Sequence, residues 1–443
     1  MMDLQVLVVG GGIQGVGVLH DLASRGVKGL RLVEHGRLAS ATSGRSTKLL
    51  HGGLRYLEHP GQWGLVREAL RERTLLLDLL PGVVRPLPIV LPCGPKGRPS
   101  WQLRLGLWLY DALAGGSNLP RARRLSGEEI RALAPYLPPA AIDHLTAAFL
   151  YHDAQMRDDA VVRLVAAAAE RLRATVSEHT VAEAVTPVPG GFRVELAGPQ
   201  GRETLTARAV VNAAGAWCTA NLLRWGLDPA VVAVLNVGSH LLFRPSLTPA
   251  DPDAAAGTLF QHRDGRVVFF LPWGGQWLLG TTESVLAGDP SDLRMPEADR
   301  DYLLTVARAL LGCSTPEEHV AEAFAAVRTM PVGTLPAAKR RVVPDAWRQD
   351  PFASPFYLRE FPKSLSAVSR EAVLDEGTPG LVSIYGGKFT TYRAQSERVG
   401  DLVCRRLGVP VPSATKSPAL WFLDEIRERS PELFESDRTL RNS

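Results

Sequence analysis

Short apolar runs alternate with amphipathic segments at the start of the chain. Residues 5–9 ("QVLVV") form an apolar run, the glycine-rich "GGGIQGVG" follows, and an amphipathic segment continues to residue 25. A second run, "LRLVEH", reaches Glu34. Continuous apolar runs of this length are typical of buried parallel strands, and the segment between them is typical of a helix. The pattern predicts an N-terminal βαβ unit.

The middle of the chain shows the same pattern and then becomes rich in strands. An Ala- and Val-rich helix is predicted at 158–173, with strands near 176–185, 191–196 and 209–212. The segments "VGSHLLFR", "RVVFFLPW" and "WLLGTTES" then alternate polar and apolar positions and carry aromatics, which indicates an antiparallel sheet. Near the end, an apolar strand at 381–385 enters a Gly-Gly turn and a helix that continues to about residue 407.

These elements predict an α/β fold with a discontinuous Rossmann-like domain and an inserted β-rich domain that carries the substrate site. We expect residues 1–80, 151–235 and 375–410 in the first domain and residues 81–150 and 236–374 in the second. The proline-rich segment 331–362, with basic residues at 339–341, is predicted to be a surface excursion. Residues 411–443 are polar and are predicted to form a loosely docked tail.

Composition and charge narrow the class of protein. With 45% hydrophobic and 22% charged residues the chain is typical of a soluble globular enzyme, and a net charge of +4 gives little reason to expect a nucleic-acid partner. The four cysteines are far apart without a C-x-x-C pair, so neither a zinc site nor a disulfide framework is indicated, and we expect no metal and a reducing, cytoplasmic compartment.

No signal peptide and no apolar run of about eighteen residues is visible, so we expect no spanning helix. The apolar stretch 101–115 ("WQLRLGLWLYDALAG") is interrupted by Arg104 and Asp111. We predict a helix that faces the core, with contact at a membrane surface as the alternative.

The glycine-rich turn carries the first chemical signal. Gly10, Gly12 and Gly15 fit the pattern G-x-G-x-x-G, and Glu34 lies nineteen residues beyond Gly15. In such a turn the glycines permit close approach of a pyrophosphate to the backbone, the helix N-terminus attracts the phosphates, and the acidic residue binds a ribose. The sequence therefore predicts a dinucleotide site; the alternative is a glycine-rich turn with a surface glutamate.

A second segment, residues 42–58 ("TSGRSTKLLHGGLRYLE"), gathers cations and hydroxyls around a Gly-Gly pair. Taken alone, it fits a solvated surface loop.

Several motifs together resemble a known family. "VVGGGIQGVG", "ATSGRSTKLLHGGLRYLE", "LGLWLYD", "VVNAAGAW", "GSH", "LPW", "GTTE" and "GGKFTTYR" follow the order and approximate spacing of the FAD-dependent glycerol-3-phosphate dehydrogenase family. The resemblance extends from about residue 3 to 408 and places the chain among the glutathione-reductase-like flavoproteins, which include D-amino-acid and sarcosine oxidases. Most of the family's C-terminal helical domain has no counterpart in this sequence.

The resemblance implies that FAD, and not NAD, is the cofactor. It implies that the ADP half is held by Gly10, Gly12, Gly15 and Glu34. It places Thr42, Ser43, Ser46, Thr47 and Lys48 along the pyrophosphate and flavin, and Ala214 and Gly215 close to the cofactor. Gly387, Lys388 and Phe389 would lie at the pyrimidine edge of the flavin, where Lys388 and a helix dipole stabilise negative charge.

The resemblance also gives the basic segment a role. A phosphate ester carries nearly two negative charges, which guanidinium groups bind bidentately. The matched positions are Arg55 and Tyr56, Arg328, Arg370, Lys388 and His240. The implied reaction oxidises the C2 hydroxyl of sn-glycerol 3-phosphate, or of a close polyol phosphate, to the ketone. Hydride goes to the flavin and the proton to a base, His240, although this histidine can instead serve as a hydrogen-bond partner only. Electrons then pass to a quinone, with peripheral contact at the inner face of the cell membrane.

Two other functions stay open at this point. One is an oxidase of another hydroxy or amino acid, which uses oxygen and needs a single arginine for a carboxylate. The other is a flavin-binding protein without catalysis. Two departures from the family bear on the site: the motif "GVRPL" is replaced by "AVRTMPVG", and a "DDAR" motif appears as "RDDAV" without its arginine.

Overall fold

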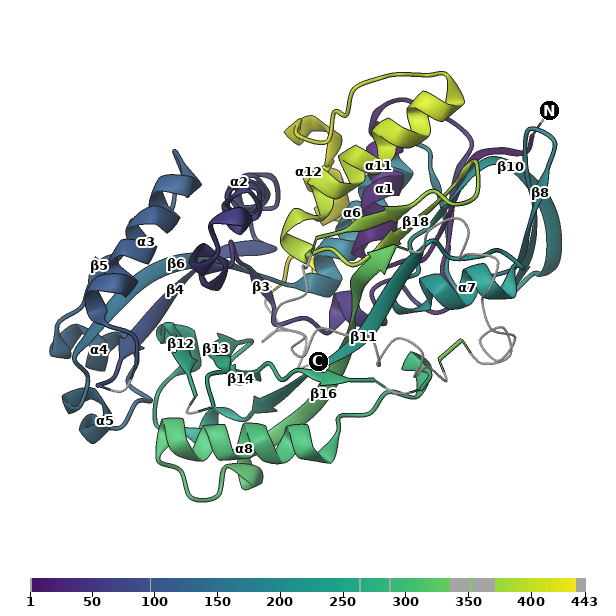
Figure 1. Ribbon diagram of the computed structural model, residues 1–443. Helices are drawn as coiled ribbons and strands as arrows, with labels where there is room; N and C mark the ends of the chain where they lie inside the picture. The colour runs from purple at the N-terminus through teal and green to yellow at the C-terminus, as the bar shows by residue number, and fades with distance from the viewer. Residues whose placement is uncertain are drawn as a thin grey trace.

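The computed structural model describes residues 2–95, 97–262, 264–286, 288–334, 351–352 and 371–435. Two sheets lie side by side, and helices pack against both of them (Figure 1). The predicted α/β fold is therefore confirmed, with one parallel and one mainly antiparallel sheet.

The first sheet has eight strands with a parallel centre. Its main order is β17-β18-β10-β1-β2-β7, and β8 and β9 extend β10 as an antiparallel hairpin. The strands are β1 (Leu4–Val9), β2 (Leu30–Val33), β7 (Thr175–Ser177), β8 (Val181–Val188), β9 (Gly191–Gly198), β10 (Gly201–Asn212), β17 (Val373–Asp375) and β18 (Leu381–Tyr385). All pairs between β18 and β7 along this path are parallel, as expected for βαβ connections.

Both faces of this sheet are covered, which explains why its strands are continuous apolar runs. On one face, Val6 and Val8 pack with the helices α1 (Ile13–Ser24), α6 (Asp158–Arg171) and α11 (Tyr392–Leu407). On the other face, Leu7 and Val9 pack with residues of the β8–β9 hairpin and of α7 (Cys218–Arg224).

The second sheet has ten strands, and β12–β4 is its parallel pair. Its order is β15-β11-β14-β13-β12-β4-β6-β3, with β16 beside β11 and β5 beside β6. The strands are β3 (Leu49–Leu50), β4 (Val84–Cys93), β5 (Arg123–Arg124), β6 (Ala147–Met156), β11 (Val231–Phe243), β12 (Gly257–Gln261), β13 (Val267–Trp273), β14 (Gln276–Gly280), β15 (Ser284–Val285) and β16 (Val320–Thr334). The domain boundaries expected from the sequence stay a prediction.

Helices cover both faces of the second sheet as well. Leu241 and Phe243 of β11 belong to a core cluster that includes residues of α8 (Glu297–Leu311), α4 (Gly127–Leu133) and α5 (Pro139–Asp143). Leu242 points the other way, into a cluster with residues of α2 (Trp63–Leu79) and α3 (Ser100–Ala114). The alternation along β11 has the period of two that the sequence predicts.

Helix α3 differs from its prediction as a core-facing helix. It buries only Leu107 and Tyr110, while Trp101, Leu105 and Trp108 are 68%, 55% and 65% exposed. The apolar residues therefore lie on both sides of the helix, and one side faces solvent. No helix in the part of the chain that the structure describes is long and apolar enough to cross a membrane.

The segment after α11 also differs from its prediction as a loosely docked tail. It contains α12 (Leu423–Arg429), which contacts α6. Trp421 is fully buried, and its ring meets that of His20 edge to face at 4.7 Å between centroids. The His20 ring nitrogen Nε2 lies 3.0 Å from the Leu420 carbonyl oxygen. Trp421, Ile426 and Leu433 thus belong to the first hydrophobic core, while many of their neighbours in the segment are exposed.

Candidate active site

A cavity of about 600 Å³ lies where the parallel strands of the first sheet end and the second sheet begins. The residues that follow β1, β10 and β18 line it, as do residues of β11 and β16. Ligands of open parallel sheets bind at the carboxyl ends of the strands, where loops converge. The fold therefore places the cavity at the expected edge.

The glycine-rich turn forms one wall of the cavity, and its glycines have different tasks. Gly10 has φ +114°, and a Cβ there would lie 2.6 Å from the Ala213 carbonyl oxygen. A Cβ at Gly15 would lie 1.8 Å from the Gly10 carbonyl oxygen, so Gly15 acts through the packing of α1 on β1 and does not line the cavity. A Cβ at Gly12 would meet only Ser43 Oγ, at 3.1 Å, and would otherwise extend into the cavity.

Glu34 lies at the end of β2 and lines the same cavity. Its two carboxylate oxygens accept hydrogen bonds from the backbone N–H groups of Gly11 (2.5 Å) and Gly36 (2.8 Å). The carboxylate is thus held rigidly beside the turn, at the position predicted for a ribose ligand.

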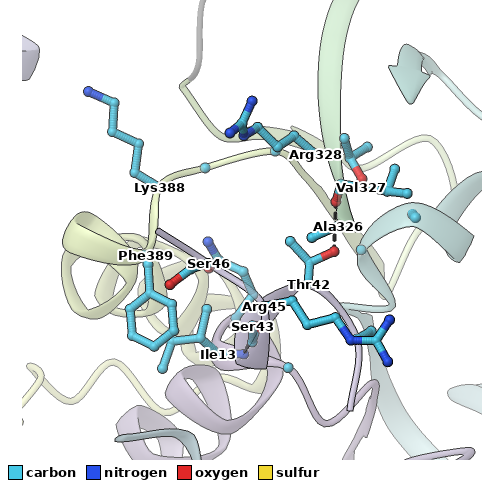
Figure 2. Close-up of a pocket in the computed structure, with 18 of the residues that line it drawn as sticks. Ile13, Thr42, Ser43, Arg45, Ser46, Ala326, Val327, Arg328, Lys388 and Phe389 are labelled. Carbon is cyan, nitrogen blue, oxygen red and sulfur yellow. Dashed lines mark hydrogen bonds between the residues drawn. The ribbon is translucent and has the colours of Figure 1, made fainter. Parts of the chain in front are cut away.

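The short helix η1 (Thr42–Gly44) joins this turn to the second sheet. Ser43 Oγ accepts a hydrogen bond of 3.0 Å from the first N–H of α1, that of Ile13. Thr42 Oγ1 donates to the Val327 carbonyl oxygen of β16 at 2.6 Å (Figure 2). Thr42, Ser43, Ser46 and Thr47 all line the cavity, and their contact with the pyrophosphate and flavin stays a prediction.

Lys48 is placed differently from its prediction beside the pyrophosphate and flavin. Its φ is +61°, and its ammonium donates to Asp158 Oδ1 at 2.7 Å and to the Gly44 carbonyl oxygen at 2.8 Å. Asp158 is fully buried and also accepts hydrogen bonds from the backbone and side chain of Ser46. Lys48 therefore neutralises a buried carboxylate and lines a second, smaller hollow.

His240, on β11, is buried in the wall that the second sheet contributes. Its Nε2 lies 2.8 Å from Thr47 Oγ1, and its Nδ1 has no hydrogen-bond partner among the described residues. Burial lowers the pKa of this imidazole well below its ordinary value, and the nearby charges of Arg328 and Lys48 lower it further. The ring is therefore neutral at physiological pH.

Arg328, on β16, lies across from Asn236 of β11. Its guanidinium donates to Asn236 Oδ1 at 3.2 Å and to Thr281 Oγ1 at 3.0 Å. A Cβ at Gly238 would lie 2.6 Å from Arg328 Nη2, so a glycine is needed there to admit the side chain. Figure 2 shows Arg328 and Lys388 on the opposite side of the view from Ile13 and Phe389.

Lys388 contacts Tyr56 of η2 (Leu54–Glu58), and Arg55 of η2 is exposed. Lys388 Nζ lies 4.0 Å from the centre of the Tyr56 ring, in cation–π geometry. Gly53 has φ +84° and a Cβ there would overlap the Tyr56 ring, which fixes the direction in which the chain enters η2. Arg55, Tyr56 and Lys388 all line the cavity. Arg370 lies outside the described residues.

The other predicted cofactor residues also line the cavity, namely Ala214, Gly215, Gly387 and Phe389. Sequence reasoning missed further lining residues, among them Gln14, Tyr151, Asp153 and Arg266. A signal for Asp153 is present in the sequence: its carboxylate follows the apolar run 147–151 ("AAFLY"), and a charge on a buried strand must be paired.

The cavity suits a flavin dinucleotide. The N-termini of α1 and of η10 (Phe389–Thr391), which leads into α11, both point to it, and helix N-termini favour phosphates and other negative groups. Gln14 Oε1 is buried there without a partner among the described residues, while Gln14 Nε2 donates to Gln395 Oε1 at 2.5 Å. A donor from a bound cofactor would satisfy this acceptor.

Comparisons with known proteins agree with this geometry. Residues 5–391 match the family model described as FAD dependent oxidoreductase. The chain is 36% identical over 400 residues to the D-erythritol 1-phosphate dehydrogenase of Brucella abortus, covering 89% of this chain and 72% of that one. It is 35% identical over 399 residues to the glycerol-3-phosphate dehydrogenase of Pseudomonas aeruginosa, covering 88% and 70%.

Solved structures show the same fold. The glycerol-3-phosphate dehydrogenase from Bacillus halodurans complexed with FAD superposes with a TM-score of 0.69 at 24% identity, covering 99% of this chain and 74% of that one. The L-α-glycerophosphate oxidase from Mycoplasma pneumoniae, with FAD bound, gives 0.65 at 14% identity, covering 93% and 97%. The chain belongs to the FAD-dependent oxidoreductase family, with FAD as its cofactor, and is an oxidoreductase like the glycerol-3-phosphate and polyol phosphate dehydrogenases.

Proposed function

We propose that the protein oxidises the C2 hydroxyl of sn-glycerol 3-phosphate, or of a close polyol phosphate, to the ketone. For sn-glycerol 3-phosphate the product is dihydroxyacetone phosphate. The observation that carries the proposal is that Arg55, Arg328, Lys388 and His240 all line the cavity opened by the glycine-rich turn.

The cations supply the reason for a phosphorylated substrate. Arg55, Arg328 and Lys388 come from three separate segments and line one cavity. A phosphate ester offers three acceptor oxygens and nearly two negative charges, so it can use several cations at once. A carboxylate substrate needs only one arginine, which argues against an amino-acid oxidase. Arg370, at a matched position in the sequence, is proposed as a fourth member.

His240 is proposed to accept the proton of the C2 hydroxyl. A base must be unprotonated before it acts, and the lowered pKa of His240 keeps its ring neutral. Thr47 orients the ring through Nε2. If Nε2–H donates to Thr47 Oγ1, then Nδ1 carries the free lone pair that can receive a proton. Bound FAD supplies the acceptor for the hydride that leaves C2.

The proposed function also includes the length of the polyol chain and the identity of the electron acceptor. The similarity to a D-erythritol 1-phosphate dehydrogenase supports polyol phosphates longer than glycerol phosphate as a second substrate class. We propose a quinone as the acceptor. The fold is shared with an L-α-glycerophosphate oxidase, which makes oxygen the alternative acceptor.

The exposed side of α3 supports a peripheral membrane contact. Trp101, Leu105 and Trp108 are exposed there with Arg104 between them, and Arg121 and Arg124 are exposed nearby in the chain. Aromatic residues favour the membrane interface, and basic side chains contribute on the order of 1 kcal/mol each near an anionic leaflet. We propose that this surface rests on the inner face of the cell membrane, where a quinone is available.

A substrate panel tests the proposed function. The purified protein is mixed without oxygen with sn-glycerol 3-phosphate, D-erythritol 1-phosphate, glycerol, erythritol, glycine and D-alanine, and the absorbance of oxidised flavin is followed. We expect one or both phosphate esters to bleach the flavin and the unphosphorylated polyols to leave it unchanged. Bleaching by an amino acid, or equal bleaching by glycerol, would reject the phosphate-binding site.

A further inference from the structure

We propose that Tyr110, held by the buried pair Arg73–Asp153, is a positioning residue for substrate binding: it fixes the turn at Gly52 and so sets the place of Arg55. The inference rests on the proposed function, in which Arg55 binds the substrate phosphate. None of these three residues belongs to the set inferred from the sequence.

The three side chains form a connected chain of short hydrogen bonds. Arg73 Nη1 donates to Asp153 Oδ1 at 2.6 Å, and Tyr110 Oη donates to the same oxygen at 2.7 Å. Tyr110 Oη in turn accepts the backbone N–H of Gly52 at 2.8 Å. Arg73 lies on α2, Tyr110 on α3 and Asp153 on β6, so three elements converge on one loop amide.

The network is deeply buried, which is costly for a purely structural element. Arg73, Tyr110 and Asp153 are all at most 2% exposed. Burial raises the pKa of Asp153, and Arg73 and the Tyr110 hydroxyl oppose that rise by stabilising the carboxylate. A buried ion pair gives a fold little net stability compared with apolar side chains of the same volume. It does give a fixed direction to the Tyr110 hydroxyl.

The network connects buried residues with the part of the cavity wall that Arg55 lines. Asp153 lines the cavity from β6, and Gly52 and Gly53 lead directly into η2, which carries Arg55. The turn has no spare room, because a Cβ at Gly52 would lie 2.5 Å from Leu70 Cδ2 and 2.7 Å from Tyr110 Oη. Because the Gly52 N–H is fixed, the backbone of the next three residues, which end at Arg55, begins at a defined position.

The Tyr110→Phe variant removes only the hydroxyl that joins Asp153 to Gly52. The matched control is Tyr136→Phe, since Tyr136 is equally buried, its hydroxyl bonds the Ala256 carbonyl oxygen at 2.9 Å, and it does not line the cavity. Both variants are measured with wild type for FAD content, melting temperature, and kcat and KM with sn-glycerol 3-phosphate and an artificial electron acceptor.

We expect Tyr110→Phe to raise KM roughly five- to thirtyfold with kcat within threefold of wild type, and Tyr136→Phe to leave KM within twofold. Arg55→Ala and the double variant Arg55→Ala/Tyr110→Phe complete a cycle. Because Tyr110 acts through Arg55, the double variant should have a KM within twofold of Arg55→Ala alone.

The outcomes distinguish an error in the proposed role of Arg55 from an error in the positioning role of Tyr110. If Arg55→Ala leaves KM unchanged, the phosphate-binding role of Arg55 in the proposed function fails, and this inference fails with it. If Arg55→Ala raises KM but Tyr110→Phe does not, or if the two effects multiply in the double variant, the positioning role alone is wrong. Should Tyr110→Phe not yield folded protein, hydrogen exchange of the Gly52 amide in wild type decides: protection is expected, and exchange as fast as at exposed loop amides overturns the inference.

Discussion

Replacing Arg328 with alanine removes from the cavity a guanidinium that we propose binds the substrate phosphate. Its guanidinium donates to Asn236, which is fully buried, and to Thr281, which lines the cavity. Loss of one charge-assisted hydrogen-bond partner of a phosphate costs about 1.5–3 kcal/mol. Since about 1.4 kcal/mol corresponds to a tenfold change, KM for sn-glycerol 3-phosphate should rise roughly ten- to a hundredfold.

The assay is steady-state oxidation of sn-glycerol 3-phosphate with an artificial acceptor, at matched FAD content. Arg328→Lys keeps the charge but loses the planar fork, so it should give an intermediate KM. Arg202→Ala is the control, because Arg202 is an exposed arginine on the β9–β10 hairpin that pairs with Glu183. A KM for Arg328→Ala within threefold of wild type would refute the assignment of Arg328 to the phosphate.

Three further predictions address the cofactor, the fold and the surface. Gly12→Val should fold but purify colourless, because its side chain meets only Ser43 and otherwise fills the space for the pyrophosphate; an equally yellow variant would contradict the cofactor site. Burial lowers the pKa of His20 to about 4, so below pH 6.5 the unfolded chain takes up a proton that the folded chain does not. The free energy of unfolding should therefore fall by up to about 3 kcal/mol between pH 6.5 and 4, seen as a lower melting temperature. His20→Gln should make the melting temperature less dependent on pH; an unchanged dependence would show that other groups cause it. Weak, salt-sensitive binding to anionic vesicles is expected in sedimentation and should be lost in Trp101→Ser/Trp108→Ser; equal binding by the variant would exclude α3 as the contact.

The sequence predicted the parallel sheet well because its strands are buried on both faces. Such strands are continuous apolar runs, and the strand at 381–385 coincides with β18 (Leu381–Tyr385). Helix α3 shows the limit of this reasoning: its apolar residues identify a helix, but only the tertiary structure shows that Trp101 and Trp108 have no covering element among the described residues.

The candidate site residues were predicted from motifs. The residues that the motifs misplaced or missed make contacts with partners that are distant in the sequence. Lys48 was expected at the cofactor, but its ammonium pairs with Asp158, 110 residues away. The pairing of Arg73 with Asp153 spans 80 residues and has no local signal beyond a carboxylate that follows the apolar run 147–151. Trp421 lies in the apolar stretch 419–423, but its partner His20 is in the first helix, so this contact could not be predicted from the sequence.

The central claim is that the C2–H bond of a polyol phosphate is broken in this cavity. The most direct test is the rate of anaerobic flavin bleaching with sn-glycerol 3-phosphate, compared with the same substrate deuterated at C2. We predict rapid bleaching that is severalfold slower with the deuterated substrate, with dihydroxyacetone phosphate formed in an amount equal to the bound FAD. Absence of bleaching by both sn-glycerol 3-phosphate and D-erythritol 1-phosphate, or a rate of bleaching by sn-glycerol 3-phosphate that deuteration at C2 leaves unchanged, would contradict the account.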